Sequence, residues 1–235
     1  MLAIFKREMR GYFTGVIGYV FLALFLAVAG VVFCYTTLFS MSADVSSYFT
    51  LMLILCAVIL PILTMKSFSE ERKAKTEQLL LTSPISITSM VFGKLLACYL
   101  IFGGAVVFSS LYFLLLVPYA TLKVATLIGN IVALLLVGLV FISIGLFVSS
   151  LTENQLSAAI GTIGIIFALL CVGIVSSLLP TSYWLRYVFD SISIFTRFSG
   201  FTNGYFDLAS VVYYLSVSGV FIFLTIRTFD RRRYN

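Results

Sequence analysis

The side chains of this chain that could do chemistry are concentrated in one short segment of an otherwise apolar interior. Six charged residues fall within eight positions: Glu70, Glu71, Arg72, Lys73, Lys75 and Glu77. A charge at the centre of a membrane helix costs about 2.5–3.5 kcal/mol, so these six together would cost roughly 15–20 kcal/mol. The segment Ser67–Lys94 therefore lies in water between two membrane spans, where a soluble partner can hold it.

The remaining residues offer little catalytic or metal chemistry. The chain has no histidine, which excludes a Ser-His-Asp triad and a His-ligated metal. No carboxylates pair across spans, since Asp44, Asp190 and Asp207 are isolated in the predicted external segments. The four cysteines stand singly in apolar stretches and are interpreted as small hydrophobic residues. We therefore expect a chain without enzyme activity, metal or bound cofactor.

The sequence also lacks a phosphate-binding loop. Gly93-Lys94-Leu95 has Thr88 where such a loop needs an upstream glycine, and it lacks the Ser or Thr that follows the lysine. Any ATP hydrolysis must take place on another polypeptide.

The composition indicates an integral membrane protein. Of 235 residues, 61% are apolar and only 10% are charged, against about 25% charged in ordinary soluble domains. The net charge of +6 comes from short segments that flank apolar runs, which fits membrane orientation better than nucleic-acid binding.

Six apolar runs are each long enough to cross about 30 Å of hydrocarbon. We predict spans at Gly18–Leu38, Tyr48–Met65, Met90–Val117, Val124–Ser149, Leu156–Leu179 and Leu208–Ile226. Twelve lysines and arginines fall on one side of these spans and three (Lys123, Arg186 and Arg197) on the other. Both termini and Ser67–Lys94 are therefore predicted to be cytoplasmic.

Two further segments are predicted to lie at the membrane surfaces. Within residues 1–16, apolar residues at helical spacing in Leu2–Phe13 oppose Lys6, Arg7 and Arg10, as in an amphipathic interfacial helix. The same charges could simply orient the first span. Residues 181–207 are predicted to form an external segment rich in aromatics. This segment either dips into the outer interface and closes the outer end of a transport path, or is an aromatic belt without a gating role. Its aromatic residues are Tyr183, Trp184, Tyr187, Phe189, Phe195, Phe198 and Phe201.

The charged segment is predicted to form a helix, a corner and a second helix. Ser69–Leu81 contains good helix formers, with Glu71 and Lys75 in the favourable i,i+4 order. Ser83-Pro84 stops this helix, and Pro84 suits the first turn of the next one. The unit is either a rigid knob that transmits a push into the membrane or a solvated hairpin. In the second cytoplasmic link, before the fifth span, Thr152 and Gln155 have capping-box spacing, which predicts that Thr152 caps the following helix.

The run Glu70–Ser86 (EERKAKTEQLLLTSPIS) resembles the signature of ABC-2 type permease subunits, which have an acidic-basic start, Gly-Thr-Glu, two leucines and Thr-x-Pro-x-Ser. Gly93-Lys94 is similar to the family's entry to the third helix, and Ser149–Gln155 to the segment before its fifth. The resemblance covers the whole chain and is closest to short permeases of the gliding-motility and nitrous-oxide-reductase-maturation types. Lys75 stands where the family usually has glycine, which argues against a special backbone turn there but not against the helix.

The resemblance implies an all-α integral membrane fold forming a single transmembrane domain over residues 1–235. It has six transmembrane helices, an N-terminal interfacial helix, an external segment before helix 6, and a cytoplasmic coupling region at residues 67–89. That region would dock on a separate ATPase subunit, which binds ATP and Mg. The implied contact residues are Glu70, Glu71, Arg72, Thr76, Glu77, Leu79, Leu80, Thr82 and Pro84, with Glu153 and Asn154 in the second cytoplasmic link.

The implied assembly contains a second permease subunit, identical or similar, and lies in the bacterial cytoplasmic membrane, in contact with its lipid and with any accessory subunits. The resemblance implies that the chain is part of an ATP-driven transporter, and export is the expected direction. Two alternatives stay open: a membrane anchor or force-transmitting subunit of a signalling or motility complex, and an ATP-independent transporter. The latter usually needs ionisable residues within the membrane, and none is predicted at mid-span.

Overall fold

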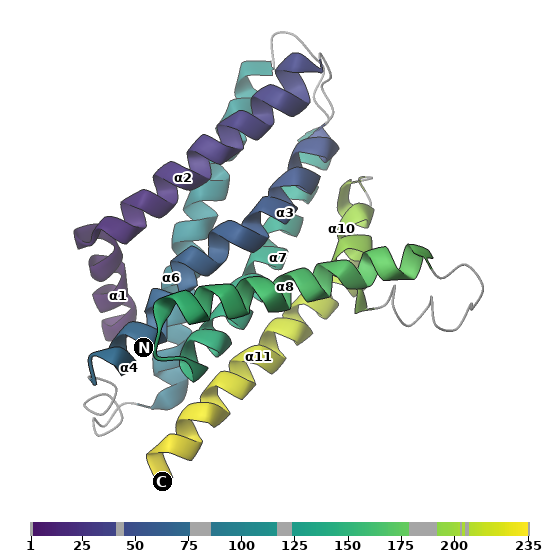
Figure 1. Ribbon diagram of the computed structural model, residues 1–235. Coiled ribbons are helices and arrows are strands. Elements are labelled where there is room, and N and C mark those ends of the chain that lie inside the picture. The colour runs from purple at the N-terminus through teal and green to yellow at the C-terminus, as the bar shows by residue number, and fades with distance from the viewer. Residues whose placement is uncertain are drawn as a thin grey trace.

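The computed structural model describes residues 2–40, 45–75, 86–116, 124–178, 192–202, 204 and 207–234, and these parts of the chain are helical (Figure 1). The α-helices are α1 (Leu2–Thr14), α2 (Val16–Phe33), α3 (Val45–Thr64), α4 (Lys66–Lys73), α6 (Ile87–Ser110), α7 (Val124–Leu151), α8 (Gln155–Leu178), α10 (Ile194–Thr202) and α11 (Leu208–Tyr234). A π-helical turn, η1 (Cys34–Phe39), extends α2, and a 3₁₀ turn, η2 (Leu111–Leu116), extends α6.

Six of these helices are long and apolar enough to cross a membrane, which confirms the predicted number of spans. They cover Val16–Phe39, Val45–Lys73, Ile87–Leu116, Val124–Leu151, Gln155–Gly173 and Leu208–Arg232. The chain is thus a multi-pass membrane protein with an all-α fold. The predicted starts lie within three residues of the observed helices, and the largest difference is at α11, which continues to Tyr234.

Helix α7 is the centre of the bundle. It contacts α3, α6, α8, α10 and α11, and two thirds of its apolar stretch is buried inside the protein. Close approach is possible because Gly145 faces α3: a Cβ there would lie 2.2 Å from Thr64 Oγ1. Glycine therefore lets the end of α3 pack directly against the α7 backbone, which places α4 beside the end of α7.

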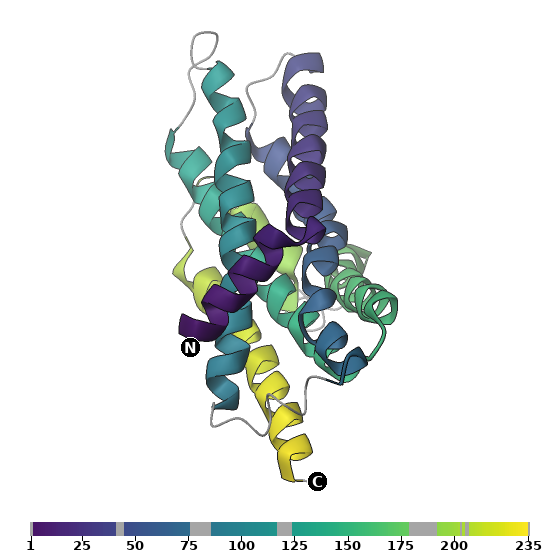
Figure 2. The same cartoon turned by 90° about the vertical axis from the view of Figure 1, so that its left-hand side faces the viewer.

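Helices α1 and α2 meet in a sharp elbow at Gly15, so α1 lies across α6 (Figure 2). The elbow brings the Tyr12 carbonyl so close to Gly18 that an added Cβ would lie 2.4 Å from it. The buried Tyr12 hydroxyl donates a hydrogen bond to the Leu63 carbonyl at 3.2 Å, which fixes α1 against the end of α3. The predicted N-terminal helix is confirmed as a helix, while its placement in the membrane interface stays a prediction.

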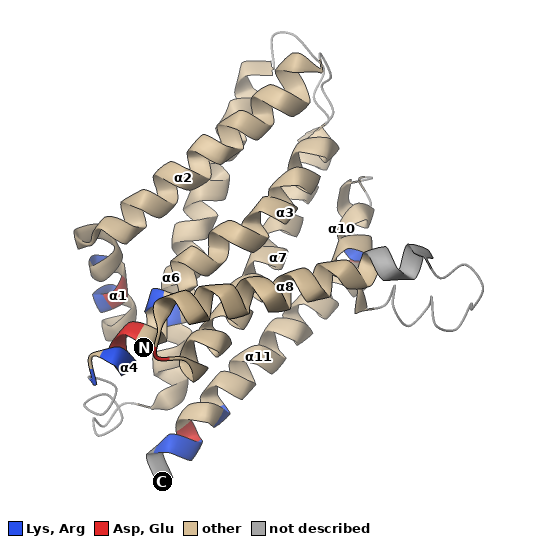
Figure 3. Cartoon of the chain, viewed as in Figure 1, with Lys and Arg blue, Asp and Glu red and all other residues tan. Residues whose placement is uncertain are grey.

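Charged residues gather at one end of the molecule, where α1, α4 and the last turns of α11 lie with both termini (Figure 3). We call this the charged end. At the opposite end, Phe198 and Phe201 of α10 are buried, and Arg197 lies 4.6 Å from the Tyr213 ring. The aromatic residues Tyr183, Trp184, Tyr187 and Phe189 lie outside the described residues. The arrangement agrees with the predicted clustering of basic residues, and the side of the membrane that each end faces stays a prediction.

Candidate functional site

Helix α4 begins the predicted coupling region, and a hydroxyl from another helix caps its first turn. Only Met65 separates α4 from α3, so the first N–H groups of α4 need partners from elsewhere. The backbone N–H groups of Phe68 and Ser69 both donate to Ser149 Oγ of α7, each at 3.1 Å. The Ser149 hydroxyl in turn donates to the Met65 carbonyl at 3.3 Å. The start of α4 is therefore fixed to the end of α7.

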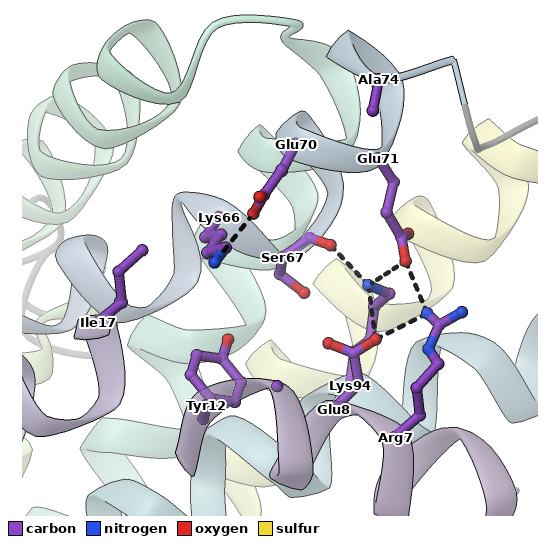
Figure 4. A pocket seen from close by; sticks show the side chains of 11 residues that line it. Arg7, Glu8, Tyr12, Ile17, Lys66, Ser67, Glu70, Glu71, Ala74 and Lys94 are labelled. Atoms are coloured by element: carbon purple, nitrogen blue, oxygen red, sulfur yellow. Dashed lines mark hydrogen bonds and ion pairs between the residues drawn. The ribbon is translucent and has the colours of Figure 1, made fainter. Parts of the chain in front are cut away.

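One face of α4 enters a buried ion cluster formed by Arg7, Glu8, Glu71 and Lys94 (Figure 4). The side chain of Lys94, on α6, is only 1% exposed. Its ammonium lies 3.0 Å from Glu71 Oε1 and 3.2 Å from Glu8 Oε1, and it donates to the Ser67 carbonyl at 2.6 Å. A lysine ammonium has three donors, so Lys94 uses all three to hold α1 and α4 against α6.

Arg7 completes the ion cluster from the solvent side. Its Nη2 lies 2.7 Å from Glu71 Oε1 and 2.8 Å from Glu8 Oε1, and its side chain is half exposed. Burial by itself lowers the pKa of Arg7, but the carboxylates of Glu8 and Glu71 outweigh this effect and raise the pKa. Two cations and two carboxylates thus balance, which compensates for the partial removal of these charges from water.

A cavity of about 330 Å³ adjoins the ion cluster. Its walls include Tyr12, Ile17, Ser67 and the ion pair of Lys66 with Glu70, whose charged atoms are 3.3 Å apart. Ser67 Oγ is buried and has no hydrogen-bond partner within the described part of the chain. A water takes about 30 Å³ of liquid volume, so the cavity can hold several waters that would satisfy this hydroxyl.

The other face of α4 contacts the link between α7 and α8. Arg72 donates through Nη1 to the Leu151 carbonyl at 2.7 Å, and its Nη2 lies 3.0 Å from Glu153 Oε1. Asn154 Oδ1 accepts the Leu156 N–H at 3.1 Å and so caps α8. The predicted capping box at Thr152 is wrong, because its hydroxyl donates back to the Val148 carbonyl instead. Of the two nominated link residues, Glu153 therefore pairs with α4, whereas Asn154 caps α8.

The predicted helix Ser69–Leu81 is also wrong in its extent. Helix α4 ends at Lys73, and Lys75 has a φ of +56°, in the left-handed region that ends a helix. The turn that we expected a lysine to disfavour is thus present, at a cost of about 1–2 kcal/mol relative to a right-handed conformation. Because Lys75 lies beyond the helix, the expected Glu71–Lys75 pair is replaced by the pairs of Glu71 with Arg7 and Lys94.

Helix α6 begins at Ile87, and the Ser86 side chain caps it by accepting the Ser89 N–H at 3.4 Å. Pro84 therefore precedes this helix instead of standing in its first turn. Among the nominated contact residues, Glu70, Glu71 and Arg72 are described and lie together on α4. The others lie outside the described residues, namely Thr76, Glu77, Leu79, Leu80, Thr82 and Pro84.

Four residues that hold α4 were not nominated from the sequence: Arg7, Glu8, Lys94 and Ser149. A signal existed for two of them, since Glu8 is an acidic residue among basic ones and Lys94 is a charge inside a predicted span. In the described parts of the chain, no three Cys, Asp or Glu side chains come together as a candidate metal site.

Comparison with known families agrees with this architecture. The family model described as ABC-2 family transporter protein matches residues 2–232, which is nearly the whole chain. No curated protein matches the chain in sequence. The matched region contains all six apolar spans and the charged segment between the second and third. The chain therefore belongs to the ABC-2 family of transporter proteins.

Proposed function

We propose that this chain, a membrane permease subunit of an ABC transporter, is driven by a separate ATPase that docks on the segment following α4. The observation that carries this proposal is the fixation of α4 on both of its faces. The ion cluster joins α4 to α1 and α6, and Arg72 joins it to the end of α7. A force applied to the segment between α4 and α6 is therefore passed to several spans at once.

The position of α4 in the chain supports the same conclusion. Met65 alone separates it from the second span, and the third span begins at Ile87. Any displacement of the docking segment would pull on both spans, while the Ser149 cap keeps α4 from unwinding under the load. The chain lacks a phosphate-binding loop of its own, so ATP and Mg belong to the partner.

The full transporter in this proposal contains two permease subunits, and ATP binding opens a path between them toward the outside. Export suits apolar spans, which can admit a lipid-like or hydrophobic cargo from the membrane. In vesicles with the ATPase outside, ATP should move such a cargo from the outer leaflet into the inner leaflet or lumen. Movement in the opposite sense would contradict the assignment as an exporter.

The docking segment can be tested by purifying the tagged chain from its native membrane in mild detergent. We expect an ATP-binding protein to co-purify in a fixed ratio and to be lost from the variant with Glu77→Ala and Leu80→Ala. A control with Lys6→Ala and Leu215→Ala changes two exposed residues, one on α1 and one on α11, and should retain the ATPase. Absence of any ATPase from the unmodified chain would overturn the proposal and favour a membrane anchor or an ATP-independent transporter.

A further inference from the structure

A groove at the charged end lies where α11 leaves the membrane. With 27 residues at about 1.5 Å each, α11 is roughly 40 Å long, about 10 Å more than the hydrocarbon core. If α11 enters the hydrocarbon core at Leu208, its last turns, from about Arg227 onward, would stand at the level of the lipid headgroups.

The groove runs between α7 and α11 and has a volume of about 1050 Å³. Its apolar part is formed by Phe147 and Leu151 of α7 and by Leu224 of α11. Leu151 is 48% exposed and Leu224 is 38% exposed, so a ligand can reach this floor. The floor lies at the end of α7 and just before the last turns of α11.

The basic part of the groove continues along the same face of α11. Leu224, Arg227 and Arg231 follow the i, i+3, i+7 spacing of one helix face, so the surface changes from apolar to basic toward the end of the helix. Three arginines and one aspartate line the groove, giving it a net charge of +2.

The three arginines differ in what holds them. Arg232 donates to the Ser150 carbonyl at 2.7 Å and lies 5.7 Å from the Phe229 ring, so the protein itself fixes its guanidinium. Arg227 and Arg231 are exposed, and no carboxylate of the described residues forms an ion pair with either. They are one helical turn apart, close enough for both guanidinium groups to reach one phosphate.

We propose that this groove is a binding site for an anionic phospholipid. Its phosphate lies between Arg227 and Arg231, and one acyl chain lies along Phe147, Leu151 and Leu224. A phospholipid has the same order of groups along the membrane normal, with apolar chains deep and a charged phosphate at the surface. Charge complementarity selects an anionic lipid over a zwitterionic one, because the site has positive charge in excess.

The test uses the full-length chain in nanodiscs of phosphatidylcholine with added phosphatidylglycerol, with retained lipid counted by native mass spectrometry. We expect the wild-type chain to retain phosphatidylglycerol preferentially. The variant with Arg227→Gln and Arg231→Gln should bind it about 25-fold more weakly, about fivefold for each arginine. This measurement needs no ATPase, so its result is independent of the proposed function.

Two further variants separate the groove from general surface charge. Lys6→Gln with Arg10→Gln removes two exposed positive charges at the same end and should leave retention within about twofold, as expected for distant, screened charges. Leu224→Trp fills the apolar floor without changing charge and should also release the lipid. An equal loss in the Lys6 and Arg10 variant, or full retention in Leu224→Trp, would overturn the proposal.

The same experiments would also reveal two other occupants of the groove. Displacement of the lipid by millimolar inorganic phosphate would indicate a free-phosphate site and contradict the role of the acyl chain. If the arginine variant loses the ATPase but keeps phosphatidylglycerol, the groove is a protein-docking surface and the lipid proposal fails.

Discussion

The two faces of α4 are fastened by similar charged residues in very different surroundings. Glu71 joins the ion cluster, where Lys94 is almost fully buried and both carboxylates are largely covered. The next residue, Arg72, reaches a carbonyl at the end of α7 and pairs with Glu153, whose side chain is 67% exposed. Burial and not residue type therefore decides how much each contact contributes, since water screens the exposed Arg72–Glu153 pair more strongly than the pairs of the buried Lys94.

The largest effect is expected for Lys94→Met. This substitution removes the buried cation between Glu8 and Glu71 and leaves Arg7 as the remaining cation of the ion cluster, and losing one partner of a buried ion pair costs about 3–5 kcal/mol. The free energy of unfolding, measured by SDS titration in mixed micelles, should fall by that amount. Lys6→Met, on the exposed face of α1, is the matched control and should change it by less than about 0.5 kcal/mol. A loss below about 1 kcal/mol in Lys94→Met would remove the distinction between the two faces.

An intermediate effect is expected for Ser149→Ala. The substitution removes the acceptor of two buried N–H groups at the start of α4, so we expect a loss of about 1–3 kcal/mol. Hydrogen exchange of the Phe68 and Ser69 amides should become faster, which a general loss of packing in α7 would not do selectively. Ser216→Ala is the control, because the exposed Ser216 hydroxyl donates to the Val212 carbonyl of its own helix. Unchanged exchange at these two amides would contradict the cap.

The smallest effect is expected for Glu153→Gln. The ion pair with Arg72 is exposed, so its loss should lower the free energy of unfolding by at most about 1 kcal/mol. The difference between variant and wild type should disappear in about 1 M salt, where the Debye length falls to about 3 Å. If the loss matched that of Lys94→Met, the outer contact would be as important as the ion cluster.

The spans and the site differ in how far the sequence predicts them. Each of the six spans can be read from a local run of apolar residues. Charged residues are costly inside the membrane, so the first charge after a run marks the end of the span to within a few residues. The site depends on pairs that are distant in sequence, such as Lys94 with Glu8, which are 86 positions apart. No local rule brings these residues together, because their contact requires the α1–α2 elbow and the packing of α1 on α6.

The end of α4 shows a different limit. The residues from Ser69 to Leu81 favour a helix, and lysine has no preference for the left-handed conformation. Lys75 nevertheless takes that conformation, at the position where the signature that the sequence resembles has glycine. The family pattern therefore located the turn better than the propensity of the residue did.

The cap on α4 also sets an order for biosynthesis. Ser149 is made 80 residues after Ser69, so α4 leaves the ribosome well before its cap exists. At about 5–20 residues per second, the delay is roughly 4–16 seconds. During this time the second and third spans can insert into the membrane, but the start of the coupling region has no partner for its first N–H groups. The cap at the start of α4 is therefore completed only after the fourth span has been made.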